Sequence, residues 1–234
     1  MSNLPSAHPG EPHKSHRANW LRAGVLGADD GIVSTSSLML GVLAASASRS
    51  AILTAGIAGL VAGALSMAVG EYVSVSSQRD SEKADIVKEK RSLAENPKEE
   101  LAELAGIYES RGLEAKLALQ VAKQLHEHDA ISAHARDEIG IDQEALANPL
   151  QASLASAVSF TVGSLVPIIA ALASKGRAGW VIVAASLVAL AISGAIGAYI
   201  GGGHRLVAAS RVFLGGGAAM AITAFIGHLV GHTL

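Results

Sequence analysis

The chain has 234 residues, of which 50% are hydrophobic and 16% are charged, and its formal net charge is −2. Average soluble domains carry about 25% charged residues, so this composition indicates a membrane protein. The near-neutral balance gives no indication of a nucleic-acid partner. The absence of cysteine excludes a disulfide framework and a thiolate metal site.

Charged residues and glycines fall in different parts of the chain. Sixteen of the 20 Asp and Glu lie between residues 80 and 144, a stretch that holds only three of the 25 glycines. This contrast predicts an all-α membrane protein with one polar insert. The start of the chain is polar and lacks the basic-then-apolar order of a signal peptide. The predicted parts are a disordered tail (1–19), transmembrane helices 1 and 2 (20–77), a helical insert (78–147) and transmembrane helices 3 to 5 (148–234).

Five segments have the roughly 20 apolar residues that a membrane-spanning helix needs. They cover residues 20–47, 51–70, 150–174, 178–203 and 212–234. The first qualifies only if Asp29 and Asp30 are tolerated there. Five spans put the termini on opposite sides, and 15 of the 18 Lys and Arg lie on the side of the N-terminus and insert. Because the side richer in Lys and Arg is usually cytosolic, we expect the N-terminus and the insert in the cytosol.

The insert is expected to form three helices. No Gly or Pro occurs between Glu71 and Asn96, so the second span is predicted to continue as one helix until Pro97 ends it. A second helix is expected over 98–110, and a third over 113–139, ending at Gly140. The third has apolar residues at helical spacing, which predict a buried face made of Leu117, Val121 and Leu125.

Three carboxylates lie in the membrane part, at Asp29, Asp30 and Glu71. A charged side chain at the bilayer centre costs about 2.5–3.5 kcal/mol on insertion scales, so such residues are candidates for function. Asp30 lies deepest. Met67 precedes Glu71 by four residues and shares its helix face. Carboxylate with thioether suits Fe²⁺ or Mn²⁺ better than Na⁺. The alternatives are a lipid-facing or core Met67, and headgroup-level positions for Asp29 and Glu71.

The insert holds a second group of candidate metal ligands. They are Glu89, Glu100, Glu103, His134 and Glu138. The Glu100–Glu103 and His134–Glu138 spacings, i,i+3 and i,i+4, let each pair present two side chains to one side of a helix. The alternative is an ordinary solvated helix face. His126 and His128 are interpreted as surface residues.

Sequence motifs of enzymes are missing. The His126-Glu127-His128 run fails the HExxH zinc pattern because position 130 is alanine. No Glu-x-x-His pair supports a ferritin-like di-iron site, and no P-loop indicates direct use of ATP. We therefore expect a protein that is not an enzyme and carries no prosthetic group.

Two runs in the membrane part and one in the insert resemble a known family. Residues 25–34 read VLGADDGIVS, residues 63–74 read GALSMAVGEYVS, and residues 133–140 read AHARDEIG. These runs resemble the signatures of the vacuolar iron transporter family, the last one in its prokaryotic form. The resemblance covers residue 20 to the C-terminus. It implies a five-helix homodimeric transporter with its pore between subunits, which moves Fe²⁺, and often Mn²⁺, out of the cytosol in exchange for protons.

The resemblance also implies roles for individual residues. Asp30 would be the pore carboxylate and Met67 the pore thioether. The acidic metal positions of the cytosolic domain correspond to Glu89, Glu100, Glu103 and Glu138. This chain departs from eukaryotic members at Gly59, where they carry Glu, and at Glu71, where they carry Gly. An acidic position is replaced by Ser92, and a Met pair by His134 and Ala135.

The expected function is therefore export of Fe²⁺ or Mn²⁺ by proton antiport across the inner (plasma) membrane of a cell. The pore ligands would be Asp30 and Met67, with Asp29 and Glu71 as further candidates. Protons would be the counter-ion, because metal ligands must be deprotonated. The alternative is a membrane-anchored metal-binding sensor or storage protein that transports nothing.

Overall fold

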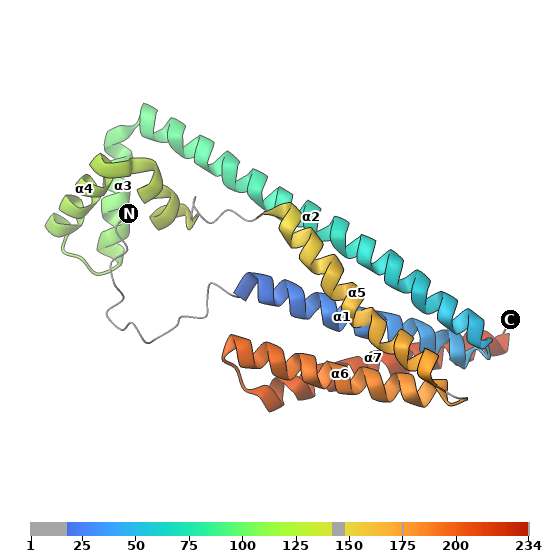
Figure 1. The fold of residues 1–234 in the computed structure, drawn as a ribbon. Coiled ribbons are helices and arrows are strands. Elements are labelled where there is room, and N and C mark those ends of the chain that lie inside the picture. The colour runs from blue at the N-terminus through green and yellow to red at the C-terminus, as the bar shows by residue number, and fades with distance from the viewer. Residues whose placement is uncertain (1–17, 142–147, 175, 234) are drawn as a thin grey trace. The chain divides into compact units, whose positions relative to one another are not determined.

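The computed structural model describes residues 18–141, 148–174 and 176–233, so most of the predicted tail lies outside the described residues. All regular structure in these residues is helical (Figure 1). The chain divides into two compact units. We call the described residues of Met1–Tyr72 and Leu150–Leu234 the membrane unit, and those of Val73–Pro149 the polar unit.

Five helices contribute to the membrane unit. They are α1 (Ala18–Ala44), the first half of α2 (Arg49–Glu95), α5 (Pro149–Ala173), α6 (Ala178–Gly201) and α7 (Arg205–Thr233). Four of these, α2, α5, α6 and α7, are long and apolar enough to cross a membrane. The chain is thus a multi-pass membrane protein. α1 is less apolar because it carries Asp29, Asp30 and a run of four hydroxyl residues, so a fifth span stays a prediction.

Close contact between α1 and α5 fixes the segment around the two aspartates. A Cβ added at Gly31 would overlap the backbone carbonyl of Phe160, and one added at Gly163 would overlap that of Ala28. Small residues at both positions let the two backbones meet, as in many membrane helix pairs. Two hydrogen bonds support the contact: Thr35 donates to Ser164 Oγ (2.9 Å), and Ser164 donates to the Gly31 carbonyl (3.2 Å).

The start of α7 differs from the sequence prediction. Residues 204–211 were expected to form a connection, but α7 begins at Arg205. The run from Arg205 to Arg211 contains no Gly or Pro, and its aliphatic residues continue the helix. Only residues 202–204 separate α6 from α7, with Gly202 in the left-handed conformation (φ 80°).

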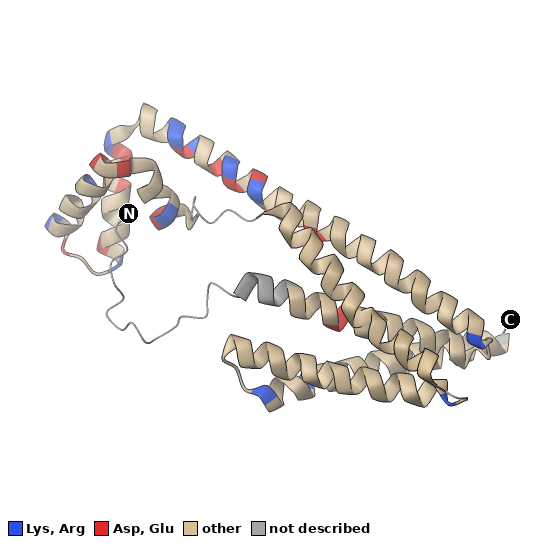
Figure 2. Cartoon of the chain, viewed as in Figure 1, with Lys and Arg blue, Asp and Glu red and all other residues tan. Residues whose placement is uncertain are grey.

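The polar unit contains the second half of α2, α3 (Pro97–Ser110), α4 (Ala115–His134) and a π-helical turn, η2 (Ala135–Ile139). The prediction that α2 continues unbroken to residue 95 is confirmed. Most of the coloured charge in Figure 2 lies on the helices of this unit. Its core packs α3 against α4 through buried apolar residues, namely Leu104, Ala105, Tyr108, Ala118, Ala122 and Ala133.

Two predictions for the third insert helix are wrong in detail. The buried stripe of α4 is Ala118 and Ala122, whereas Leu117 is 47% exposed. Alanine allows α3 and α4 to approach closely, so larger neighbours lie at the edge of the contact. The helix is also not regular to residue 139. It has extended backbone at Asp129 (φ −162°, ψ 88°) and changes to η2 after His134, before the left-handed Gly140 ends it.

Candidate metal sites

Four side chains in the polar unit converge on one point. Each of Glu89 (α2), Glu100 (α3), His134 (α4) and Glu138 (η2) offers a ligand atom, and these atoms all lie within 4.8 Å of one another. His134 Nδ1 lies 3.1 Å from a Glu89 oxygen, 3.0 Å from one of Glu138 and 3.8 Å from one of Glu100. We call this set the carboxylate–histidine cluster. Three oxygen donors and one imidazole form a ligand set suited to a divalent transition metal.

The local sequence explains how the cluster forms. Pro97 stands at the first position of α3, so α3 follows α2 after Asn96 alone. Glu89 and Glu100 are therefore close in sequence but lie on different helices. His134 and Glu138 lie on either side of the change from α4 to η2. Single π-turns of this kind occur frequently at functional sites.

The cluster holds more negative charge than its own residues can neutralise. Glu89, Glu100 and His134 are buried. The single proton that Nδ1 can carry serves only one carboxylate, here Glu138. Glu89 Oε1 has no hydrogen-bond partner among the described residues. Buried charges are normally paired or bound to metal. An oxygen that accepts no hydrogen bond and shares His134 with two other carboxylates therefore fits a site that takes a cation.

Burial and mutual repulsion shift the pKa values of the cluster carboxylates. Burial raises the pKa of Glu89, and the Glu138 carboxylate raises it further, while His134 acts in the opposite direction. Burial also raises the pKa of Glu100, followed by repulsion from Glu103. Glu103 itself is exposed and lies outside the cluster. The structure thus brings together four of the five predicted insert ligands. Glu103 is not among them and acts on the cluster only through its charge.

His126, interpreted from sequence as a surface residue, is half-buried against the cluster. Its ring contacts that of His134, with centroids 6.0 Å apart and an interplanar angle of 77°. His126 Nδ1 and His134 Nε2 are both buried without a hydrogen-bond partner among the described residues. Helical spacing does not extend from His126 to His134, because the backbone is extended at Asp129 between them, so the sequence carries no local signal for this contact.

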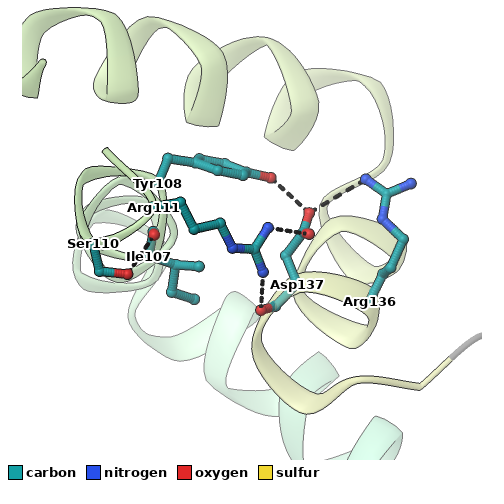
Figure 3. A network of polar contacts seen from close by, with 6 residues as sticks. All are labelled: Ile107, Tyr108, Ser110, Arg111, Arg136 and Asp137. Carbon is teal, nitrogen blue, oxygen red and sulfur yellow. Dashed lines mark hydrogen bonds and ion pairs between the residues drawn. The ribbon is translucent and has the colours of Figure 1, made fainter. Parts of the chain in front are cut away.

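A second network fixes η2 to α3 beside the cluster (Figure 3). Asp137 accepts hydrogen bonds from Tyr108 (2.7 Å), Arg111 (2.7 Å) and Arg136 (3.2 Å), and Arg111 also donates to its backbone carbonyl. Burial would raise the pKa of Asp137, but these donors outweigh it and lower the pKa. Burial and the bond to Asp137 raise the pKa of Tyr108 to about 12. The network thus fixes the position of Asp137, which directly precedes the cluster residue Glu138 in the chain.

The membrane unit contains a cavity of about 220 Å³ between α1, α2 and α5. It is lined by Asp30, Ser34, Thr35, Leu38, Gly59, Gly63, Ser66, Met67 and Phe160. Two of the four predicted pore ligands, Asp30 and Met67, therefore share this space, which we call the Asp30 cavity. Hydroxyl groups make up much of its remaining polar lining. Carboxylate, hydroxyl and thioether groups together can replace water around a metal ion.

The other two predicted pore ligands do not line the Asp30 cavity. Asp29 is half-buried, and its Oδ1 has no hydrogen-bond partner among the described residues. Glu71 is half-buried near the end of the membrane unit. Gly59, in contrast, lines the cavity next to the Leu38 side chain. Glu71 lies twelve residues further along α2, roughly 18 Å along the helix axis, so it does not replace a carboxylate at position 59 within this cavity.

Comparisons with known proteins agree with the resemblance in the sequence. The sequence profile of the VIT family matches residues 21–228. A "Vacuolar iron transporter" of Acanthamoeba castellanii is 47% identical over 94% of this chain and 83% of its own length. "Vacuolar iron transporter homolog 5" of Oryza sativa is 40% identical over 94% of this chain and 84% of its own length. "Vacuolar iron transporter homolog 4" of Arabidopsis thaliana is 40% identical over 93% of this chain and 87% of its own length. The chain belongs to the VIT family.

Proposed function

We propose that this protein carries Fe²⁺ and Mn²⁺ out of the cytosol in exchange for protons. The observation that carries the proposal is the Asp30 cavity, which brings a carboxylate and a thioether together between apolar helices. The names of the relatives support iron as a cargo. Mn²⁺ is included because the cluster in the polar unit offers only oxygen and imidazole ligands.

Asp30 is the proposed binding group for the cargo. Its carboxylate, with Thr35 and Ser66 nearby in the lining, would replace part of the hydration shell of the ion. Met67 adds a soft ligand, which favours Fe²⁺ and Mn²⁺ over Na⁺ and Mg²⁺. A ligand carboxylate has to lose its proton before it binds metal. Competition between metal and proton for Asp30 would therefore couple the two fluxes.

A homodimer with the pore between subunits is part of the proposal. Asp30 is exposed on the surface of a single chain. A carboxylate that faces lipid is unfavourable by about 2.5–3.5 kcal/mol at the bilayer centre. A second copy covering α1 and α2 would remove both carboxylates from lipid and enclose a path between them.

The proposed orientation has five spans, with the N-terminus and polar unit in the cytosol. The carboxylate–histidine cluster would then collect metal on the side from which it is exported. The distribution of Lys and Arg supports this orientation. A location in the plasma membrane stays a prediction, because the names of the relatives place those proteins in vacuoles.

Metal flux into vesicles tests the proposal. Purified protein is reconstituted, and entry of Mn²⁺ or Fe²⁺ is recorded together with internal pH, with and without an imposed pH gradient. We expect metal movement and an opposite proton movement, both lost in Asp30→Ala. Asp85→Asn removes an exposed carboxylate outside the cluster and serves as the control. Flux at the wild-type level in Asp30→Ala would overturn the assignment of the cavity.

A second candidate function is a membrane-anchored metal sensor or store, favoured by the buried carboxylate–histidine cluster. The double change Glu89→Gln and Glu100→Gln separates the two functions. A transporter keeps its flux when metal is saturating, because the Asp30 cavity is intact. A sensor or store shows no flux in wild type and loses all metal binding in the variant.

A further inference from the structure

A second cavity lies in the membrane unit at the turn between α6 and α7, far in sequence from every residue assigned above. Its volume is about 450 Å³. It is lined by Ala198, Gly201, Gly203, His204, Val207, Ala208 and Arg211. The lining thus includes one guanidinium and one imidazole, and it contains no acidic side chain. This composition is that of a site for an anion.

A second arginine directly follows one of these lining residues in the chain. Arg205 follows the lining residue His204, and its guanidinium carbon lies 4.3 Å from the centroid of the Tyr199 ring. Stacking on an aromatic face orients an arginine and leaves its N–H groups free to bind in the guanidinium plane. Arg205, Arg211 and His204 are all exposed, so a ligand can reach them.

No carboxylate among the described residues forms an ion pair with Arg205 or Arg211. The first turn of α7 is also free of acidic residues. Arg111, in contrast, pairs with Asp137, and Arg49 donates to two backbone carbonyls at the end of α5. The positive charge at the α6–α7 turn is therefore available to an outside anion.

Apolar side chains surround the basic residues. Leu206, between the two arginines in sequence, is 77% exposed, and Leu214, one turn after Arg211, is 68% exposed. Tyr199 is also exposed, at the end of a helix that is long and apolar enough to cross a membrane. Basic pockets between membrane helices with an apolar and aromatic border bind the head groups of anionic lipids.

We propose that the α6–α7 turn is a binding site for a phosphate group, carried by an anionic phospholipid. Arg211 and His204 contact the phosphate from the cavity wall, and Arg205 contacts it beside His204. The planar fork of arginine matches phosphate oxygens in a bidentate way. The exposed leucines contact the acyl chains. This site takes no part in the proposed binding of Fe²⁺ or Mn²⁺.

Native mass spectrometry of the full-length protein tests the proposal. The protein is equilibrated in neutral detergent with phosphatidylglycerol and phosphatidylcholine of matched acyl chains, and the retained lipids are counted. We expect wild type to retain phosphatidylglycerol preferentially. Loss of one arginine lowers its affinity roughly 5-fold, and the double variant Arg205→Gln/Arg211→Gln lowers it about 30-fold. Equal retention of the two lipids by wild type, or equal phosphatidylglycerol retention by wild type and the double variant, would overturn the proposal.

Two controls keep the test specific. Arg177→Gln removes the same charge at the opposite end of α6 and is expected to leave retention unchanged. Arg205→Lys/Arg211→Lys keeps the charge and is expected to restore part of the affinity, which separates loss of binding from loss of folding. A fall in retention with Arg177→Gln as large as that of the double variant would mean that overall charge, and not this site, binds the lipid.

A titration with inorganic phosphate distinguishes the two sources of the phosphate group. Phosphate that displaces phosphatidylglycerol from wild type, when chloride at equal ionic strength does not, shows that the site also takes a free anion. Failure of phosphate to displace the lipid assigns the site to lipid alone. Both results support phosphate recognition. Equal displacement by chloride and phosphate would show general charge screening and overturn it.

Discussion

Replacing Glu89 by glutamine tests the view that the carboxylate–histidine cluster is built for a metal and is unfavourable without one. Glu89 is 6% exposed, and its Oε1 has no hydrogen-bond partner among the described residues. Leaving a buried polar group unsatisfied costs about 1–3 kcal/mol, and more if it is charged. Glu89→Gln removes the charge and nearly keeps the shape. We expect the metal-free variant to be more stable than metal-free wild type by about 1–3 kcal/mol.

Metal should stabilise both proteins, but wild type much more than the variant. At a metal concentration of 100 times the wild-type Kd, binding stabilises wild type by about 2.7 kcal/mol. If loss of this ligand weakens binding about 100-fold, the gain of the variant falls to about 0.4 kcal/mol. Thermal unfolding followed by circular dichroism, in chelator and in Mn²⁺, measures both quantities. Glu103→Gln, which removes an exposed charge outside the cluster, is the control.

The pH dependence gives an independent check of the same reasoning. Burial, then the Glu138 charge, raises the pKa of Glu89 above its ordinary 4.5, so the folded protein keeps a proton that the unfolded chain releases. The destabilising effect of Glu89 is therefore absent below about pH 4.5 and grows as the pH rises through the raised pKa. The stability difference between metal-free variant and wild type should vanish at low pH. A variant that is less stable without metal, or one with an unchanged metal-induced shift, would refute the reasoning.

Three other contacts can be tested by substitution: the Asp137 network, the α1–α5 contact at Gly31 and the ring contact of His126. Asp137→Asn should lower stability by about 1–3 kcal/mol by breaking charged hydrogen bonds; since the pKa of Asp137 is lowered, its contribution is present above its ordinary 3.8 and lost as the pH falls, which denaturation from pH 2 to 7 measures. Gly31→Ala should reduce the yield of folded protein on size exclusion, because its Cβ overlaps the Phe160 carbonyl, whereas Gly70→Ala, in open space, should not. His126→Ala should weaken Mn²⁺ binding in a titration, because it removes the ring that contacts His134, whereas His126→Phe, which keeps an aromatic ring, should weaken it less.

Regular spacing made much of the fold predictable from the sequence. The unbroken α2 follows from the absence of Gly and Pro up to Pro97, and the end of the polar helices follows from Gly140. The grouping of Glu100, His134 and Glu138 was predicted from pairs at i,i+3 and i,i+4. Residue pairs at these spacings place side chains on one face of a helix, but they do not show which helices pack against each other. Glu103 satisfies the same spacing as Glu100 but points to solvent.

The structural features that could not be predicted from the sequence depend on contacts between helices. Leu117 was expected in the core from the helical spacing of Leu117, Val121 and Leu125, but α3 packs on the smaller Ala118 and Ala122. His126 approaches His134 on an α4 that is bent at Asp129, and no local pattern predicts that bend. No prediction was made for Asp137, because two of its three hydrogen-bond donors, Tyr108 and Arg111, lie 29 and 26 residues away in the chain.

The glycine at position 59 bears on how many carboxylates the Asp30 cavity can offer to a metal ion. Gly59 lines the Asp30 cavity, and Glu71 is too far along α2 to supply a carboxylate there. Each chain therefore offers one carboxylate to this cavity, and a divalent ion would need a second negative charge for full neutralisation. In the proposed homodimer that second charge is Asp30 of the other copy. Two carboxylates, two thioethers and several hydroxyls would then surround the ion, and protonation of either aspartate would weaken its binding. In the proposed homodimer, the missing carboxylate at Gly59 would therefore make proton coupling depend on the Asp30 pair alone.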